Sequence, residues 1–417
     1  MTNAQANAIR LFAFTFCVTS AYMINRIVGD SALLARLGPD ILPIMLVFSA
    51  LIVGIISYIW AHRSQDVSLA QLLYQTQIGV LACTVLLAPM LHYFTRLPSV
   101  IGSVYVLAEL RGCFNLILIS TLLNEHFCSQ TETGRYAFVN AGSPVAGIAM
   151  GVLLGLKARA IPPAYLLASC CVLDIIAIAI GSRVISKGKR IAARELPTHF
   201  EPGVVNPDRL GKPGIDRRIR RFVRVLMIVI VSKTIVMSIV SFEWKVVADR
   251  ALGHDERSLA RYFGLFYAVS DGLILFIQLT LTRQVIQKLG IRMSLLLLPF
   301  ALVGSGVVSL FTDDVRWLLV AVTVARGSMV VRRSIHDVSV QLVYGAMPKT
   351  VRRGVVARIL GIAKPVAEAG AAGGVALLAG SVPTKTFAWF WMPFLAVWIY
   401  STLHLGRAWE RVSGGDG

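Results

Sequence analysis

The sequence predicts an all-α integral membrane protein with twelve transmembrane helices in two pseudo-symmetric six-helix bundles. Three observations support this prediction. Of the 417 residues, 56% are hydrophobic and only 15% are charged, with a mean hydropathy of +0.70, which is too much apolar surface for one aqueous domain to bury. The hydrophobic residues fall in twelve stretches that are each long enough to cross a bilayer. A long basic segment separates the first six stretches from the last six.

The predicted spans follow one another through the chain. They are expected near residues 9–36, 41–61, 68–93, 98–127, 134–158, 162–185, 220–247, 260–286, 290–311, 316–346, 354–380 and 384–406. Several exceed the roughly 20 residues that a straight span needs, so these helices should tilt or extend into water. Six spans on each side of a charged connection is the layout of secondary transporters that are built from two related halves.

The connection between the sixth and seventh spans sets the predicted domain boundaries. The N-terminal bundle covers 1–185, the basic linker 186–219, and the C-terminal bundle 220–417. The linker contains four prolines and many charges without apolar periodicity, which predicts a cytoplasmic loop.

The net charge of +19 is concentrated in segments on one side of the predicted membrane. The largest is Lys187–Arg224, and two others are Arg283–Arg292 and Lys349–Arg358. By the positive-inside rule, this asymmetry predicts that both termini lie in the cytoplasm. A bacterial cytoplasmic (inner) membrane is the location that we expect for the chain. The lipid bilayer is the expected partner of these residues. No nucleic-acid recognition fold accompanies the charge, so a nucleic-acid partner is not expected.

Motifs for enzymatic or metal chemistry are absent from the sequence. It contains no P-loop, GxSxG or HExxH pattern. The six cysteines form no CxxC pair, so we expect small core residues and neither a disulfide framework nor a metal site. The prediction is a protein that is not an enzyme and needs no cofactor, with any protein partner left open.

Two short matches indicate that the halves are an internal repeat. Leu110-Arg111-Gly112 in the fourth span matches Ala325-Arg326-Gly327 in the tenth, at an offset of 215 residues. Ser143-Pro144-Val145-Ala146 in the fifth span matches Lys364-Pro365-Val366-Ala367 in the eleventh, at an offset of 221. A proline breaks the hydrogen bonding of a helix, and transporters place such breaks near a central cavity.

Three oppositely charged pairs have the i,i+4 spacing that puts both members on one helix face. They are Arg26 with Asp30, Arg333 with Asp337, and Lys364 with Glu368. Ionisable side chains at bilayer depth are costly and usually face an interior cavity. Each pair either neutralises itself and holds helices together, or belongs to a functional site.

The repeat-related Arg111 and Arg326 each lie near the middle of their spans. Pseudo-symmetry would place them on opposite walls of one cavity, where a guanidinium binds phosphate or carboxylate with a planar fork. The alternative is structural pairing, of Arg111 with Glu109 or Asp174 and of Arg326 with Asp271.

On the anion-binding interpretation, the basic residues would grip the solute and the acidic residues would hold them or carry a coupled ion. The predicted site residues are Arg26, Asp30, Glu109, Arg111, Asn115, Lys233, Asp271, Arg326, Lys364 and Glu368.

Three stretches carry a family resemblance. Arg26-Ile-Val-Gly-Asp30, Tyr105-Val-Leu-Ala-Glu-Leu-Arg-Gly112 and the segment Arg353–Lys364 are similar to conserved stretches of the nucleotide transporter family, the ATP/ADP exchange carriers and their bacterial relatives. Leu42-Pro43 and Arg261–Phe266 resemble the family's second-span and eighth-span entries.

The resemblance implies a major-facilitator-like fold and anionic, phosphate-bearing solutes. It also implies that Glu109 and Lys364 are key residues, with Asp271 the nearest candidate for a second key acid. The chain departs from the family at Gly29, where the family carries lysine, and at Arg111, where it carries tryptophan.

The functional prediction is a secondary transporter that moves a nucleotide-like anion by alternating access, as an antiporter or with a coupled ion. A non-transporting membrane scaffold or sensor on the same frame is the alternative. A lipid or drug exporter would instead need an apolar cavity with fewer bases.

Overall fold

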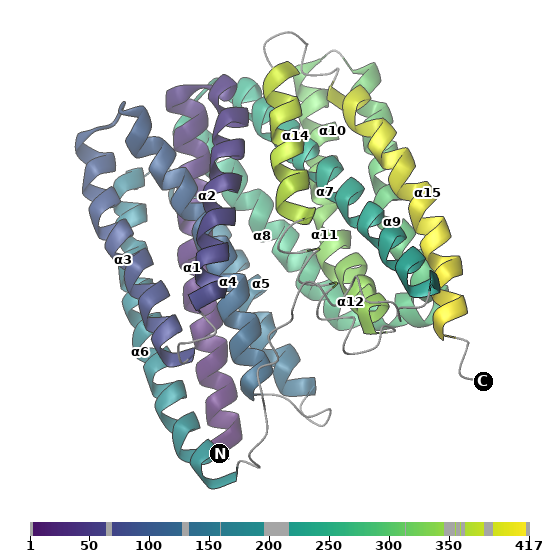
Figure 1. Ribbon diagram of the computed structural model, residues 1–417. Coiled ribbons are helices and arrows are strands. Elements are labelled where there is room, and N and C mark those ends of the chain that lie inside the picture. The colour runs from purple at the N-terminus through teal and green to yellow at the C-terminus, as the bar shows by residue number, and fades with distance from the viewer. Residues whose placement is uncertain are drawn as a thin grey trace. The chain divides into compact units, whose positions relative to one another are not determined.

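The computed structural model describes residues 3–63, 69–126, 133–158, 160–195, 217–312, 314–345, 355, 359, 363–378 and 387–413. Over these residues every regular element is a helix and no strand occurs (Figure 1). The predicted all-α class is therefore confirmed.

Each of the first six predicted spans coincides with one helix. These are α1 (Asn3–Leu37), α2 (Leu42–Arg63), α3 (Leu69–Tyr93), α4 (Pro98–His126), α5 (Thr133–Lys157) and α6 (Pro163–Glu195), with the short η1 (Pro39–Ile41) before α2. Pro98 and Pro163 begin their helices, where the missing N–H of proline removes no hydrogen bond. Residues 186–195 of the predicted linker extend α6, and residues 196–216 lie outside the described residues.

The second half is also helical, and its tenth predicted span is divided among several elements. Its elements are α7 (Arg217–Ala251), α8 (Glu256–Thr280), α9 (Thr282–Phe311), α10 (Val315–Gly327), α11 (Met329–Val331), the π-helical η4 (Arg332–His336), α12 (Asp337–Gly345), α14 (Lys364–Leu378) and α15 (Phe387–Ser413). The tenth predicted span thus contains a π-helical turn. Most of residues 346–362, where the eleventh was predicted to begin, lie outside the described residues.

The boundary between the eighth and ninth spans differs from the prediction. α8 ends at Thr280 and α9 begins at Thr282, whereas the spans were expected to meet between residues 286 and 290. Within α9, Gly290 has a φ of 73°, a left-handed conformation that glycine adopts without strain. The predicted start of the ninth span therefore marks this bend in α9.

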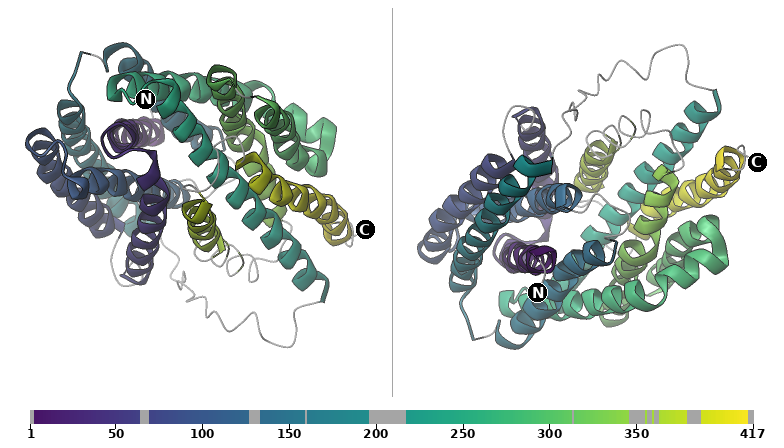
Figure 2. Two further views of the ribbon diagram at one scale, coloured as in Figure 1. Left: turned by 90° about the horizontal axis from the view of Figure 1, so that it is seen from above. Right: turned by 90° about the horizontal axis from the view of Figure 1, so that it is seen from below.

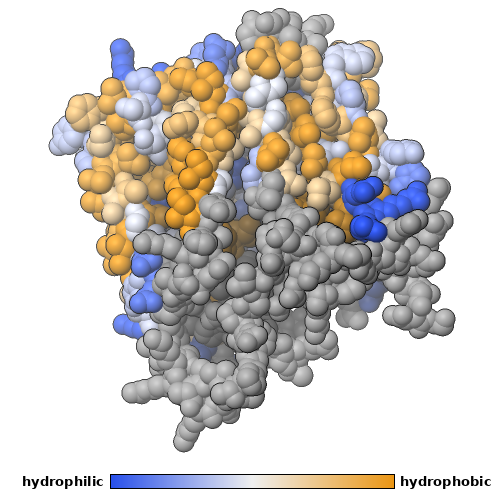
Figure 3. All heavy atoms as spheres, in the orientation of Figure 1, coloured by the Kyte–Doolittle hydropathy of each residue, from blue (hydrophilic) through white to orange (hydrophobic). Residues whose placement is uncertain are grey.

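Nine helices of the described chain, α1 to α9, are long and apolar enough to cross a membrane. Their outer faces carry exposed apolar side chains. On α2, Ile44, Phe48, Leu51 and Ile55 form one stripe at helical spacing, and each is more than half exposed. Figure 3 shows hydrophobic residues spread over much of the surface in view. Such a surface suits contact with lipid and would be costly in water.

The described chain forms two compact units. Unit 1 contains Met1–Gly38, Ile55–Pro202 and His254–Gly272, and unit 2 contains Pro39–Gly54, Gly203–Gly253 and Leu273–Gly417. In unit 1, α1 packs against α4, α5 and α6, and α3 packs against α6 (Figure 2). Leu11, Phe14 and Val18 of α1 are buried in this core with Leu73 and Leu118.

In unit 2, α7 has the central place. It packs against α15, α10 and α14, and α9 packs against α15 and α10. The largest side chains of this core are Trp244 of α7 and Trp391 and Trp398 of α15, all almost completely buried.

An ion pair fixes the C-terminal end of α1 in unit 1. Arg36 donates from Nε and Nη2 to the two carboxylate oxygens of Glu256, at 2.9 and 3.2 Å. Its Nη1 donates to the carbonyl oxygen of Thr95, at 3.0 Å. One arginine thus joins the end of α1, the α3–α4 connection and the start of α8, and the bidentate geometry makes this stronger than an ordinary surface pair.

Glycines allow α5 and α8 to meet backbone against backbone. A Cβ atom added to Gly151 would lie 2.5 Å from the carbonyl oxygen of Gly264 and 2.8 Å from Cβ of Ala268. A Cβ atom added to Gly264 would lie 3.0 Å from the carbonyl oxygen of Gly151. Small residues at such a crossing let two membrane helices approach closely.

We predict that Gly151→Ala destabilises the protein. The added methyl group has no free space and must push α8 away from α5, at a cost of about 1–3 kcal/mol of unfolding free energy. Gly79→Ala is the matched control, since a Cβ atom there has no neighbour within 4 Å. Thermal unfolding in detergent measures both variants, and equal stability of the two would contradict this account of the α5–α8 contact.

Candidate functional site

Arg26 is the centre of a polar cluster in unit 1. Its Nη1 donates to the hydroxyl oxygen of Tyr22 at 2.6 Å, and its Nε lies 4.0 Å from the carboxylate of Asp30. The guanidinium also lies over the rings of Tyr267 and Tyr22, 5.2 and 5.7 Å from their centroids. The predicted i,i+4 pair of Arg26 with Asp30 is therefore present, as a loose ion pair within an aromatic surround.

Glu109 belongs to the same cluster. It lies on α4, close enough for its charge to act on Arg26, Tyr22 and Tyr105. Arg26, Asp30 and Glu109, which the sequence analysis predicted as site residues, are thus brought together on facing sides of α1 and α4.

The close approach of α1 and α4 explains one departure from the nucleotide transporter pattern. A Cβ atom on Gly29 would lie 3.3 Å from Cα of Tyr105, so the α4 backbone covers this position. A lysine here, as that family has, would force the two helices apart.

Asp271 is buried in unit 1 and lies one helical turn after Tyr267 on α8. Its carboxylate lies directly against Gly147 of α5, where an added Cβ atom would overlap it. Because Tyr267 lies against Arg26, the same face of α8 carries both the aromatic neighbour of that guanidinium and this acid.

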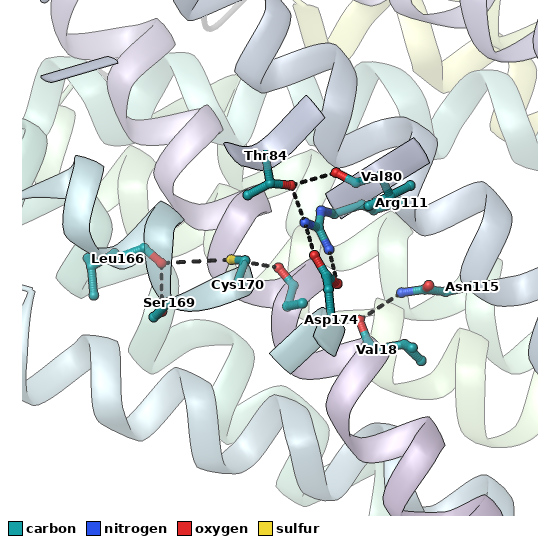
Figure 4. A network of polar contacts seen from close by, with 10 residues as sticks. Val18, Val80, Thr84, Arg111, Asn115, Leu166, Ser169, Cys170 and Asp174 are labelled. Carbon is teal, nitrogen blue, oxygen red and sulfur yellow. Dashed lines mark hydrogen bonds and ion pairs between the residues drawn. The ribbon is translucent and has the colours of Figure 1, made fainter. Parts of the chain in front are cut away.

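Arg111 lies on the opposite face of α4 from Glu109. Its Nη1 and Nη2 donate to the two carboxylate oxygens of Asp174 at 2.8 and 2.7 Å, and Nη2 also donates to Thr84 Oγ1 at 2.5 Å (Figure 4). The residue is only 2% exposed. Of the two interpretations that the sequence left open for Arg111, the structure supports pairing with Asp174.

Asn115 shares this inward face, one turn after Arg111. Its Nδ2 donates to the carbonyl oxygen of Val18 at 2.8 Å, and the residue is buried (Figure 4). The structure thus separates the predicted residues of α4 into two sets, with Glu109 near Arg26 and with Arg111 and Asn115 inside the packed bundle. Helix geometry explains the split, because residues two apart do not share a face.

Unit 2 contains a second polar cluster, centred on Asp337. Lys233 Nζ donates to Asp337 Oδ1 at 3.0 Å, and Arg332 Nε lies 3.9 Å from Asp337 Oδ2. His336 Nδ1 lies 3.4 Å from the same carboxylate, with its ring buried edge-on against Trp398. Asp337 thus has Lys233 and Arg332 as basic neighbours, and its predicted pairing with Arg333 stays a prediction.

The π-helical turn η4 explains the contact of Arg332 with Asp337. Its hydrogen bonds join residues five apart, so Arg332 at position i−5 lies beside Asp337. Because this turn is wider than an α-helical turn, side chains of other helices donate hydrogen bonds to its carbonyl groups. Thr282 Oγ1 donates to the carbonyl oxygen of Ser334 at 3.0 Å, and Gln278 Nε2 donates to that of Arg333 at 3.3 Å.

Lys364 and Glu368 begin α14 and form the predicted i,i+4 pair, with Nζ and Oε1 3.7 Å apart. Their side chains are 45% and 42% exposed. The charge of Lys364 also acts on Lys233 of α7, so the two lysines lie in one region of unit 2. That region holds Lys233, Arg332 and Lys364 against two acids, a net positive charge.

Arg326 is buried in unit 2, with its guanidinium 5.5 Å from the ring centroid of Trp244. Its predicted alternative partner, Asp271, belongs to unit 1. The pairing of these two residues stays a prediction, as does the binding of an anion by Arg326.

Sequence reasoning missed two buried acids of α7, Glu243 and Asp249. Glu243 of α7 is 2% exposed and accepts a hydrogen bond from Trp391 Nε1 of α15 at 3.2 Å. The signal was available, because Glu243 lies inside the predicted span 220–247.

Solved transporter structures are similar to this chain over nearly its whole length. For a mutant of the nucleoside transporter NupG, the TM-score is 0.68 at 11% identity, covering 96% of this chain and 99% of that one. For the xylose transporter XylE from E. coli, inward open, it is 0.65 at 12% identity, covering 96% and 95%. For a mutant of the peptide transporter POT with alafosfalin, it is 0.66 at 12% identity, covering 99% of both.

No protein-family model and no curated protein matches the sequence. The structural likeness shows the fold, which is that of the major facilitator transporters. The predicted major-facilitator-like, multi-span helical fold class is therefore confirmed.

We predict that the Arg111–Asp174 pair is a stability element. Asp174→Ala leaves a buried guanidinium without its carboxylate and should lower the unfolding free energy by about 3–5 kcal/mol. The double variant Arg111→Met with Asp174→Leu removes both charges and should recover much of this loss. Denaturation in detergent compares the two. A double variant as unstable as the single one would argue that Arg111 has another role, such as solute binding.

Proposed function

We propose that the protein is a secondary transporter that moves an anionic, phosphate-bearing small solute across the bacterial cytoplasmic membrane by alternating access. The fold supports the first part of this proposal, since the similar structures are transporters of nucleosides, xylose and peptides. The chemistry of the two polar clusters supports the second part.

The main observation behind this proposal is that charged side chains in the predicted spans of unit 2 are partly exposed. Lys364, Glu368 and Asp337 are each more than 40% exposed. A charged side chain that faces hydrocarbon costs several kcal/mol, so a half-exposed charged group in a predicted span is expected to face water. These residues therefore favour a water-filled pathway along this side of unit 2.

The sign of the charge favours an anion. Lys233, Arg332 and Lys364 outnumber Asp337 and Glu368, and Lys233 is already held by Asp337. Lys364 is held only loosely, because its 3.7 Å distance to Glu368 exceeds that of a direct hydrogen bond. Its ammonium group keeps donors for a phosphate oxygen, which makes Lys364 the leading solute-binding residue.

The family resemblance narrows the solute. The segment Arg353–Lys364 resembles the nucleotide transporter stretch that ends in a key lysine, and Glu109 stands at that family's key glutamate. A nucleotide or another phosphorylated metabolite, taken up or exchanged, is the solute we propose. Within unit 1, we propose that Arg26 is an anion-binding residue and that Asp30, Glu109 and Asp271 orient Arg26 or carry a coupled ion.

The scaffold alternative makes a different physical demand. A non-transporting protein needs all of its intramembrane charges paired and sealed, as Arg111 is with Asp174. The half-exposed charges of unit 2 favour transport over this alternative.

A thermal-shift screen of the purified protein tests the proposal. ATP, ADP, AMP, inorganic phosphate, sugar phosphates and dicarboxylates are added one at a time, and a ligand that binds the folded state raises the unfolding temperature in a saturable way. Selective stabilisation by phosphate-bearing compounds supports the proposal. A well-folded protein that responds to none of them would contradict it.

We predict that Lys364→Gln weakens binding of the stabilising anion roughly ten- to hundredfold, because a hydrogen bond to a charged group contributes about 1.5–3 kcal/mol. Lys288→Gln removes the same charge from an exposed position of α9 and should leave binding unchanged. Calorimetric titration of both variants provides the measurement. Equal affinities would remove Lys364 from the binding site.

A further inference from the structure

Glu243 is a buried carboxyl group that the proposed solute site does not use. It lies on α7 of unit 2, about two turns before the helix ends at Ala251. The residue is 2% exposed, among the most buried acids of the described chain. A glutamate in this position must find compensation from its neighbours or change its charge state.

The neighbours of Glu243 offer one neutral hydrogen bond. Trp391 Nε1 donates to Oε2 at 3.2 Å, and Oε1 has no hydrogen-bond partner within the described part of the chain. Trp391 is itself fixed in place, being 1% exposed and packed against Gly306 of α9, where an added Cβ atom would overlap the indole ring.

Charged groups on every element packed against α7 are engaged elsewhere or face away. On α10, Arg326 lies against Trp244, and on α14, Lys364 and Glu368 form a pair. On α15, Tyr400 and His404 contact one another, and on η1, Asp40 is exposed. On α7 itself, Lys245 and Asp249 follow two and six residues later, on other faces of the helix, and Arg250 follows seven residues later, two turns away at an exposed position.

No ion pair to Glu243 exists among the residues that the structure describes, and no charge there acts on its carboxyl group. An ionised carboxylate in this position would lose its whole hydration shell and keep only one N–H donor. This loss of hydration would cost several kcal/mol. The neutral acid loses far less on burial. While this pocket is sealed, the side chain is therefore a carboxylic acid that holds a proton.

We infer that Glu243 is a proton-binding site through which this protein couples proton movement to transport. The inference rests on the proposed transport function for its coupling role, though the binding of the proton does not depend on it. The carboxylate takes one proton from water when the pocket opens on one side, forming an O–H bond. It holds that proton while sealed and releases it to water when the pocket opens on the other side.

The position of Glu243 on α7 suits this role. Lys233, which belongs to the proposed solute site, lies ten residues earlier on the same helix, about 15 Å along its axis. A rigid helix that carries both sites moves them together. Occupation of one site can therefore bias the conformation that the other requires.

Infrared titration of the full chain in liposomes, without any solute, tests proton binding directly. The wild type should show a protonated-carboxyl band that disappears as the pH is raised, and Glu243→Gln should lack it. Trp391→Phe removes the hydrogen-bond donor and should shift the band to higher frequency, which keeps the test valid if the glutamine variant folds poorly. Asp40→Asn, at an exposed acid, should leave the band unchanged. An identical titration in wild type and Glu243→Gln would overturn the inference.

Transport in proteoliposomes tests coupling. With radiolabelled ADP or inorganic phosphate, a pH gradient of one unit can drive about tenfold accumulation for each coupled proton. The wild type should accumulate the label, whereas Glu243→Gln should only equilibrate it while still exchanging it. Gradient-driven accumulation by the variant would refute coupling through Glu243. A wild type that carries neither compound would contradict the proposed function, and the infrared titration would still decide the proton site.

Discussion

The whole structure depends on one constraint: a charged or polar group at bilayer depth has no water to hydrogen-bond with and must find its partners inside the protein. Arg111 meets this constraint most completely, with both guanidinium nitrogens Nη1 and Nη2 bound to Asp174 and one of them also to Thr84. This network ties α3, α4 and α6 together around the central α1. Backbone carbonyl groups in the π-helical turn follow the same rule. Thr282 of α9 donates a hydrogen bond to the carbonyl oxygen of Ser334, and Gln278 of α8 donates one to that of Arg333.

The degree to which each charge is satisfied separates structural groups from functional ones. Arg111 is sealed and doubly bound, which suits a group whose task is to hold helices. Lys364 is half exposed and 3.7 Å from its carboxylate, which leaves its ammonium group available. Glu243 lies between these cases, sealed from water with one neutral donor. A carrier needs all three kinds: charges that never move, charges that meet the solute, and a group that changes its charge.

Much of the fold could be predicted from the sequence, because hydrophobic length alone determines where a chain crosses a bilayer. The predicted spans match the helices closely, and i,i+4 spacing correctly paired Arg26 with Asp30 and Lys364 with Glu368. The site was harder. Glu109 and Arg111 were grouped because they are close in sequence, although helical residues that are two positions apart point in different directions. The contact of Arg332 with Asp337 depends on a π-helical turn that no periodicity indicated, and the buried Glu243 was not singled out although it lies inside a predicted span.

The π-helical turn at Arg332–His336 also bears on how this region can change over evolution. Such a turn holds one residue more than an α-helical turn and advances about the same distance along the axis. Deletion of a single residue there would restore an ordinary helix and leave the orientation of α10 relative to α12 nearly unchanged, because the π-helical turn holds the extra residue within one revolution. A single insertion or deletion event is therefore enough to add or remove the turn that brings Arg332 beside Asp337, while the helices on either side keep their orientation.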